Sequence, residues 1–256
     1  MSANNPFDVS DKVALVTGAS RGIGKCIAKL LAAQGAKVIV SSRKLEGCEE
    51  TVQEIQAAGG QAEAVACHIG DPDAIESMSQ HLQSQYGTLD ILVNNAAANP
   101  YFGPIVDTDL GAFQKTVDVN VRGYFFMSVM GAKLMAKNGG GSIINVASVN
   151  GVVPGEFQGI YSITKSAVIA MTKAFAKECA KDNVRVNALL PGATDTKFAA
   201  TLVKNPVILE KALQHIPMNR IAEPDEMAGA VLYLASSAAS YCTGSTLTVD
   251  GGYLLV

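Results

Sequence analysis

Short apolar runs alternate with longer amphipathic stretches along most of this 256-residue chain. A parallel strand buried on both faces is apolar throughout, whereas a helix that covers a sheet is apolar on one side only. The alternation therefore predicts an α/β fold, a doubly wound parallel sheet of about seven strands with helices on both faces. The expected strands are Val13–Val16, Lys37–Val40, Ala62–Cys67, Leu89–Val93, Ser142–Ala147, Val184–Leu190 and Leu247–Val249. The expected helices are Gly22–Gln34, Leu45–Ala58, Asp71–Tyr86, Thr108–Lys137, Ser162–Lys181, Thr196–His215 and Pro224–Ala235.

Composition excludes several other classes of protein. Hydrophobic residues make up 48% of the chain, charged residues 17%, and the formal net charge is −3, which disfavours a nucleic-acid partner. No apolar run reaches transmembrane length, and Met1–Asp11 lacks the apolar core of a signal peptide, so we expect a cytoplasmic protein that does not bind a membrane. The five cysteines form no C-x-x-C motif and the three histidines show no ligand spacing, so we expect no metal.

A glycine-rich turn follows the first expected strand and opens the first expected helix. It reads Thr17-Gly18-Ala19-Ser20-Arg21-Gly22-Ile23-Gly24. Glycines allow a tight turn and let a dinucleotide pyrophosphate approach the backbone, while the helix N-terminus offers N–H groups and a positive dipole end. An ordinary glycine-rich turn is the plainer interpretation, but the position between strand and helix favours a dinucleotide site.

The end of the second expected strand indicates which dinucleotide binds. An NAD site usually has an acidic residue there for the ribose 2′-hydroxyl, but here the sequence is Val40-Ser41-Ser42-Arg43-Lys44, with no acid before Glu46. The planar guanidinium of Arg43 suits a 2′-phosphate, and Arg21 adds a second cation. The alternative is that Arg43 and Lys44 are solvated loop charges. We expect a preference for NADP(H).

Tyr161 and Lys165 are spaced by one helical turn, 13 residues after Ser148. A tyrosine phenol with a pKa near 10 exchanges protons poorly at neutral pH, and a neighbouring ammonium lowers that pKa. Tyr161 can then give a proton to a carbonyl oxygen as hydride reaches the carbon. Lys165 could also bind the ribose next to the nicotinamide ring. The Tyr-x-x-x-Lys pair alone is weak evidence, because many helix surfaces carry it.

Two further polar residues strengthen the interpretation. Ser148 lies at the end of the fifth expected strand, where its hydroxyl could stabilise charge on a substrate oxygen; the alternative is a turn cap. Asn120 lies inside an expected helix, a position that Asn does not favour. It could bind a water that links Lys165 to solvent, or it could simply bond to the backbone.

Together these residues resemble the short-chain dehydrogenase/reductase family, over Val13 to Gly252. The match rests on the phosphate turn, on Asn94-Asn95-Ala96-Ala97 in place of the family's N-N-A-G, on Pro191-Gly192 and on Asp250-Gly251-Gly252. The resemblance implies one Rossmann-type domain over residues 1–256, with a nucleotide half over about 12–95 and a catalytic and substrate half over about 96–256. It also implies a homotetramer.

The resemblance assigns roles residue by residue. Asn120, Ser148, Tyr161 and Lys165 fall at the positions of the family's catalytic tetrad. The residues it places at the cofactor are Gly18, Ser20, Arg21, Gly22, Ile23, Gly24, Asn95, Tyr161, Lys165, Pro191, Gly192 and Thr194. Ser42 stands where NAD-preferring members carry Asp. His68 occupies the place of an Asp that often lies beside the adenine, so the backbone of Ile69 could supply that contact instead, and a packed histidine is an equal alternative.

Within the family, Ser41–Lys44 and Asn99–Gly103 look like NADPH-dependent carbonyl reductases of the dehydrogenase/reductase type. We therefore expect reduction of a hydrophobic ketone or aldehyde, with Phe102, Phe157 and a lid over Ala193–Pro217 around the substrate. The rival is a 3-oxoacyl-carrier-protein reductase; its two basic docking positions correspond to Gly139 and Asp182 here, although lysines are adjacent. An alternative of another class is a regulator that binds NADPH without catalysis.

Overall fold

The computed structural model describes residues 5–197 and 206–255, with the backbone alone at residues 206–208 and 211. Within those residues, seven strands form one parallel sheet in the order β3-β2-β1-β4-β5-β6-β7, which confirms the expected fold class. The strands are β1 Val13–Thr17, β2 Lys37–Ser42, β3 Gln61–Ala66, β4 Ile91–Asn94, β5 Gly141–Val146, β6 Val184–Pro191 and β7 Thr246–Val249. The α-helices are α1 Gly22–Ala33, α2 Glu46–Ala57, α3 Pro72–Gln85, α4 Leu110–Val117, α5 Tyr124–Lys137, α6 Gly159–Cys179, α8 Pro206–Leu213 and α9 Ala228–Ala235.

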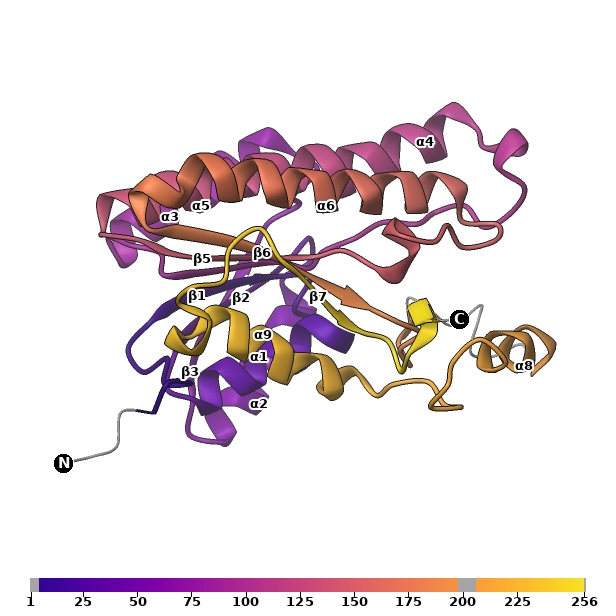
Figure 1. Cartoon of the computed structure of the whole chain (residues 1–256). Helices are drawn as coiled ribbons and strands as arrows, with labels where there is room; N and C mark the ends of the chain where they lie inside the picture. The colour runs from indigo at the N-terminus through magenta and orange to yellow at the C-terminus, as the bar shows by residue number, and fades with distance from the viewer. Residues whose placement is uncertain (1–4, 198–205, 256) are drawn as a thin grey trace.

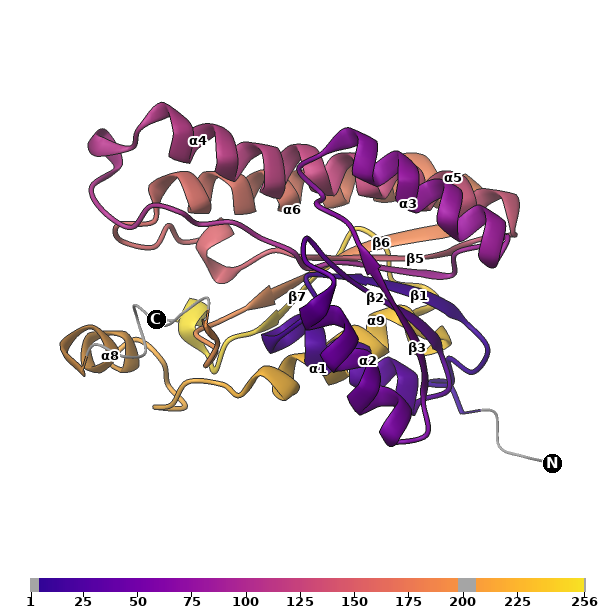
Figure 2. The same cartoon turned by 180° about the vertical axis from the view of Figure 1, so that it is seen from behind.

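The sheet is covered on both faces. Helices α3, α4, α5 and α6 lie over one face, and α1, α2 and α9 lie over the other (Figures 1 and 2). Successive side chains of a strand point to opposite faces, so Leu15 packs into the core beneath the first group of helices and Val16 into the core beneath the second. Both are fully buried, which explains why the strand sequences are apolar throughout.

The strand order reverses at β1, which pairs with β2 on one side and with β4 on the other. The chain leaves the C-terminal ends of β1 and β4 in opposite directions, and ligands of such sheets bind in the crevice that results. Helix α8 lies beyond this C-terminal edge of the sheet, at the right of Figure 1. No helix in the described ranges is long and apolar enough to cross a membrane.

The expected helix Thr108–Lys137 is wrong in detail. The structure has α4, then a π-helical turn over Asp118–Gly123, then α5. A π-helical turn holds one residue more than an α-turn, so it changes the direction in which its side chains point. Here the turn carries Asn120 at its centre, and a Cβ on Gly123 would lie 2.6 Å from the carbonyl oxygen of Ile69. Close packing against the loop after β3 accompanies the irregular turn.

Other boundaries moved by a few residues. Helix α6 begins at Gly159 rather than Ser162, so Tyr161 lies within its first turn. Strand β5 ends at Val146, two residues before Ser148. Asp71 caps α3 as expected, because its carboxylate accepts from the N–H of Asp73 at 3.0 Å. The expected helix over 196–215 contains α8, but residues 198–205 lie outside the described part.

Candidate active site

The glycine-rich turn crosses the C-terminal end of β1 with two glycines in the left-handed region. Gly18 has φ +65° and Gly22 has φ +56°, a conformation that side chains disfavour. A Cβ on Gly18 would lie 2.7 Å from Cα of Ala96, so the turn packs directly against the loop after β4. At the N-terminus of α1, Arg21 provides no side-chain cap. The first N–H groups of α1 therefore receive no hydrogen bond from the side chain of the N-cap residue, and they suit an anion such as a pyrophosphate.

Asn95 holds the turn in place. Its Nδ2 donates to the carbonyl oxygens of Thr17 at 3.0 Å and Gly18 at 3.2 Å. Its backbone N–H donates to the Thr17 hydroxyl at 2.9 Å. A Cβ on Gly24 would also collide with the Asn95 amide, which requires a glycine at that position. The structure therefore gives Asn95 a part in shaping the turn.

The loop after β2 contains the residues expected to select the cofactor. Arg43 and Lys44 are exposed, and Ser42 is half-buried. The Ser42 hydroxyl donates to the carbonyl oxygen of Lys44 at 2.9 Å and accepts from the Cys48 thiol at 3.1 Å. Its only proton is thus committed inside the loop, and Arg43 and Lys44 are the cations that the loop presents to solvent.

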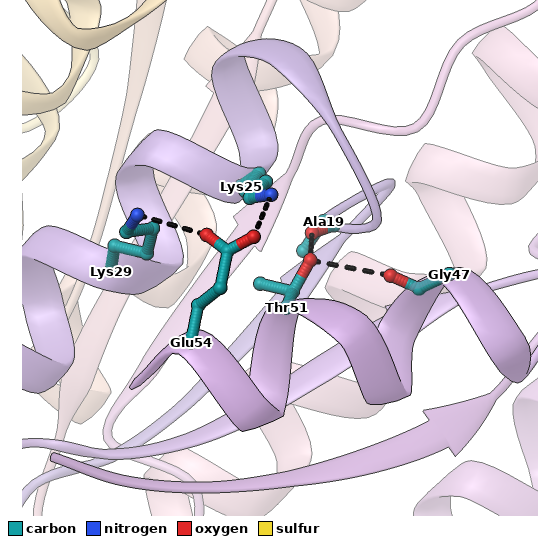
Figure 3. A network of polar contacts seen from close by, with 6 residues as sticks. All are labelled: Ala19, Lys25, Lys29, Gly47, Thr51 and Glu54. Carbon is teal, nitrogen blue, oxygen red and sulfur yellow. Dashed lines mark hydrogen bonds and ion pairs between the residues drawn. The ribbon is translucent and has the colours of Figure 1, made fainter. Parts of the chain in front are cut away.

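Helix α2 ties this loop to the phosphate turn (Figure 3). The Thr51 hydroxyl lies 3.2 Å from the carbonyl oxygen of Ala19 and 3.3 Å from that of Gly47. Ser20 also lies close to α2, because a Cβ on Gly47 would come 3.0 Å from the Ser20 Cβ. One helix therefore contacts both the glycine-rich turn and the loop after β2.

His68 and Ile69, which were expected beside the adenine, follow β3, which ends at Ala66. The His68 ring accepts from the N–H of Gly70 at 3.0 Å through Nδ1, and its Nε2 lies 2.8 Å from Nζ of Lys115 on α4. Ile69 is buried in the core. Both nitrogens of the imidazole therefore lie close to protein nitrogens, although a neutral ring can accept a hydrogen bond from only one of them. These contacts agree with the packed-histidine alternative.

The segment after β6 crosses the sheet edge beside the turn. The N–H of Gly192 donates to the carbonyl oxygen of Val249 at 2.9 Å, which joins the end of β6 at Pro191 to β7. Buried Thr194 donates to the carbonyl oxygen of Gly192 at 3.0 Å. A Cβ on Gly22 would lie 3.3 Å from the Thr196 side chain, so this segment lies over the start of α1.

The four expected catalytic residues are buried at the C-terminal side of β5. Ser148, in extended backbone, caps a short 3-10 helix by accepting from the N–H of Asn150 at 3.1 Å. Its side chain also forms a hydrogen bond with Tyr161. Nζ of Lys165 lies over the Tyr161 ring, 5.5 Å from the centroid. Ser148 therefore caps the turn, as in the alternative interpretation, and also contacts the Tyr161 phenol.

Both polar atoms of the Asn120 amide have protein partners. Its Oδ1 accepts from the N–H of Ala98 at 2.8 Å, and its Nδ2 donates to the carbonyl oxygen of Ala98 at 2.9 Å and to the Thr164 hydroxyl at 3.0 Å. The structure thus places the amide as a clamp between the loop after β4 and α6. Asn120 therefore bonds to the backbone, as in the alternative interpretation. It also bonds to Thr164, the residue before Lys165.

The charges of the site differ from the simplest expectation. Burial raises the pKa of Tyr161 to about 12, opposed by its hydrogen bond with Ser148. Burial also lowers the pKa of Lys165 to about 7. Desolvation disfavours both the phenolate and the ammonium, so in this structure burial opposes the lowering of the Tyr161 pKa that was expected from Lys165. At neutral pH Tyr161 is a neutral phenol that can donate a proton.

Part of the expected substrate pocket is described. The rings of Phe102 and Phe157 are 6.0 Å apart, and the N–H of Gly103 donates to the carbonyl oxygen of Phe157 at 3.0 Å. Both rings are partly exposed. In the expected lid, Phe198, Leu202, Val203 and the side chain of Ile208 lie outside the described residues, whereas Leu213 ends α8.

Sequence reasoning missed three buried residues of the site: Cys48, Thr51 and Tyr124. Each lies within an expected helix, where a cysteine, a threonine or an aromatic residue looks like ordinary packing. Only Thr51 gives a faint signal, because a hydroxyl on the buried face of α2 needs a partner.

Comparison with known proteins agrees with this geometry. The family model described as enoyl-(acyl carrier protein) reductase matches residues 18–254. The dehydrogenase/reductase SDR family member 4 of Bos taurus is 39% identical over 254 residues, which cover 99% of this chain and 90% of that protein. The chain therefore belongs to the short-chain dehydrogenase/reductase family of oxidoreductases, as its motifs predicted.

Two solved structures are similar over nearly the whole chain. A gluconate 5-dehydrogenase from Burkholderia cenocepacia in complex with NADP and tartrate has a TM-score of 0.94 at 29% identity and covers 98% of each chain. A 7α-hydroxysteroid dehydrogenase complexed with NADH and 7-oxo glycochenodeoxycholic acid has a TM-score of 0.93 at 35% identity, again over 98% of each chain. These two structures therefore hold different nicotinamide cofactors and different further ligands.

Proposed function

We propose that this protein reduces a carbonyl group to an alcohol with NADPH, and that Tyr161 supplies the proton. The observation that carries the proposal is the hydrogen bond between Ser148 and Tyr161, one helical turn from Lys165. All three side chains are buried or nearly so at the C-terminal edge of the sheet. The glycine turn with its uncapped helix N-terminus fits a dinucleotide at the same edge.

In this proposal each residue has a separate task. The nicotinamide cofactor, when bound, supplies the hydride. Ser148 holds the carbonyl oxygen of the substrate, and Tyr161, protonated below its raised pKa of about 12, donates a proton to that oxygen. Lys165 carries positive charge near Tyr161 and stabilises the phenolate left after the transfer. Asn120 keeps the loop after β4 in register with α6.

The preference for NADP(H) is supported by the loop after β2. Within the described residues Val40–Leu45, the charged side chains are those of Arg43 and Lys44, which are both exposed bases, and no acid is present. Arg21 at the N-terminus of α1 is exposed as well. A guanidinium binds a 2′-phosphate, but it has only donors and cannot accept a hydrogen bond from a 2′-hydroxyl.

A hydrophobic ketone or aldehyde is the substrate class that we propose, supported by the contact between Phe102 and Phe157. A 3-oxoacyl group on a carrier protein is the second candidate; the description of the matching family model names an acyl carrier protein, although with an enoyl rather than a 3-oxoacyl group. Gly139 and Asp182 stand at the expected docking positions, but exposed Lys137 and Lys181 lie close to them in sequence.

We further propose a cytoplasmic homotetramer. Phe125 and Phe126 are exposed to 44% and 46% on α5, and Phe125 packs edge-on against Phe175 of α6 at 5.2 Å. An exposed aromatic cluster on two long helices suits contact with a second copy of the chain. Light scattering tests this proposal: a mass of four chains supports it, and a monomer contradicts it.

The decisive experiment is a panel of apolar ketones, aldehydes and carrier-bound 3-oxoacyl groups, each assayed with NADPH and with NADH. We expect turnover of apolar carbonyls with the higher kcat/KM for NADPH. Arg43→Asp should lower the NADPH to NADH ratio of kcat/KM by at least tenfold, with Lys44→Asp as the matched control in the same loop. An unchanged ratio in Arg43→Asp would refute the cofactor assignment. Cofactor binding without any turnover would favour the non-catalytic regulator.

A further inference from the structure

Tyr124 is a second buried tyrosine at the site, and the reaction proposed above does not use it. It begins α5, directly after the π-helical turn, and its side chain is fully buried. Its hydroxyl donates to the carbonyl oxygen of Val146 at 3.2 Å. Nζ of Lys165 donates to the same oxygen at 2.7 Å. The phenol and the ammonium therefore share one acceptor at the end of β5.

The ring of Tyr124 also faces the ammonium. Nζ of Lys165 lies over it, 5.1 Å from the centroid, which is nearer than the 5.5 Å to the Tyr161 ring. Both distances fall within the roughly 6 Å over which the negative face of an aromatic ring attracts a cation. The attraction is stronger at a desolvated site, and only 1% of Lys165 is exposed.

The surroundings of Lys165 leave few other groups to stabilise its charge. The titratable groups that face it are the phenols of Tyr124 on α5 and Tyr161 on α6, while β5 offers the Val146 carbonyl. Within the described residues no carboxylate forms an ion pair with Lys165. A buried ammonium without a carboxylate depends on carbonyl oxygens and ring faces.

We propose that Tyr124 is a positioning residue for Lys165: its ring holds the ammonium in the protonated state, and its hydroxyl fixes the carbonyl that the ammonium binds. This rests on the proposed function only for its consequence in catalysis. Burial lowers the pKa of Lys165 to about 7, so a modest change in the ring alters the charged fraction of Lys165 at neutral pH. Tyr124 would then help to set the pH range in which Lys165 can assist Tyr161.

The charge of Lys165 can be measured directly in the cofactor-free protein. Lysine labelled with ¹³C at Cε reports protonation by its chemical shift, and the resonance missing from Lys165→Arg assigns Lys165. Comparison of Tyr124→Phe with Tyr124→Leu isolates the ring, because both variants lack the hydroxyl. We expect the Lys165 pKa to be lower in Tyr124→Leu than in Tyr124→Phe by about half a unit to one and a half units.

Two further variants complete the test, one as a control and one in case Tyr124→Leu does not fold. Tyr241→Leu is the control, because Tyr241 is fully exposed and should leave the Lys165 pKa unchanged. Trifluorophenylalanine at position 124 keeps the shape of phenylalanine but weakens the negative ring face. It should lower the Lys165 pKa relative to Tyr124→Phe, and it remains available as a test if Tyr124→Leu does not fold. In the folded variants, the alkaline limb of kcat/KM against pH should move in the same direction as the Lys165 pKa.

An identical Lys165 pKa with phenylalanine, trifluorophenylalanine and leucine at position 124 would overturn the proposal. A graded fall in the pKa would support it. The two proposals fail separately: a graded pKa in a protein that turns over no carbonyl leaves the inference on Tyr124 standing and removes the proposed function. Turnover with an ungraded pKa does the reverse.

Discussion

The hydroxyl of Thr51 donates to the carbonyl oxygen of Ala19 over 3.2 Å, which joins α2 to the glycine-rich phosphate turn. Thr51 is fully buried. The same helix carries Glu54, whose carboxylate pairs with Lys25 at 2.6 Å and Lys29 at 3.0 Å on α1 (Figure 3). Buried hydrogen bonds cost more to lose than exposed ion pairs do. Thr51 should therefore matter more to the turn than Glu54.

Replacement of Thr51 by valine tests this relationship. Thr51→Val keeps the shape and removes the donor, so the carbonyl of Ala19 loses a partner and the turn loses an anchor. We expect stability to fall by about 1–2 kcal/mol and the Kd to rise about two- to tenfold for NADPH and NADH alike. Thermal unfolding and the fluorescence of the bound reduced cofactor measure the two effects.

Two controls complete that test. Thr51→Ser retains the hydroxyl and should bind both cofactors nearly as the unchanged protein does. Glu54→Gln removes the carboxylate charge of the exposed ion pairs and should change stability by less than about 1 kcal/mol. Equal cofactor affinity in Thr51→Val and the unchanged protein would show that the phosphate turn does not depend on α2.

Cys48 should affect one cofactor only. Burial raises the pKa of its thiol, so the thiol stays protonated at neutral pH and donates to Ser42 at 3.1 Å. That contact shapes the loop that presents Arg43. We expect Cys48→Ala to raise the KM for NADPH about two- to fivefold and to leave the KM for NADH and both kcat values near their starting values. Paired steady-state assays with the two cofactors measure this.

Cys48→Ser is the matched variant, because a hydroxyl can donate to Ser42 in place of the thiol. It should restore the KM for NADPH toward that of the unchanged protein. If alanine and serine at position 48 weaken NADPH and NADH equally, the thiol supports the fold in general rather than the loop after β2.

Sequence patterns predicted the sheet because burial on both faces makes a strand apolar throughout. Leu15 and Val16 serve opposite cores, so neither can be polar. The glycine-rich turn was equally predictable, because its backbone requires glycines that are visible in the sequence. Gly18 and Gly22 adopt positive φ, and a Cβ on Gly18 would collide with Ala96. Local backbone demands of this kind appear in the sequence itself.

Contacts between distant segments were not predictable in the same way. The hydrogen bond between Asn120 and Ala98 depends on a π-helical turn, which the spacing of apolar residues does not predict. Tyr124 has the pattern of any buried aromatic residue, and its shared acceptor with Lys165 emerges only when α5 and α6 pack on β5. The depression of the Lys165 pKa by burial is likewise a property of the folded core.

The buried Lys165 should leave a signature in stability against pH. Its pKa falls from the ordinary 10.5 to about 7 on folding, so the unfolded chain binds more protons between those two values. Its destabilising effect is therefore fully present below pH 7 and is relieved as pH rises from 7 toward 10.5. Between pH 6 and pH 9 this residue should add about 2–3 kcal/mol to the free energy of unfolding.

Lys165→Met removes that dependence. Urea unfolding of both proteins at several pH values from 6 to 9 should show the unchanged protein gaining stability relative to Lys165→Met as pH rises. The window stops at 9 because the ordinary pKa of tyrosine is 10, above which the raised pKa of Tyr161 adds an effect of opposite sign. A difference in stability that stays constant with pH would mean that Lys165 keeps its ordinary pKa in the folded protein.

In the proposed reaction, the Tyr161 phenol supplies the proton to the carbonyl oxygen. Tyr161→Phe keeps the ring over which Nζ of Lys165 lies and removes only the proton donor. The most direct measurement is kcat for NADPH-dependent reduction of the best carbonyl of the panel by Tyr161→Phe, with the Kd for NADPH measured alongside. We predict a kcat lower by about 10²–10⁴-fold with a nearly unchanged Kd. A kcat within a few-fold of the unchanged protein would contradict the account.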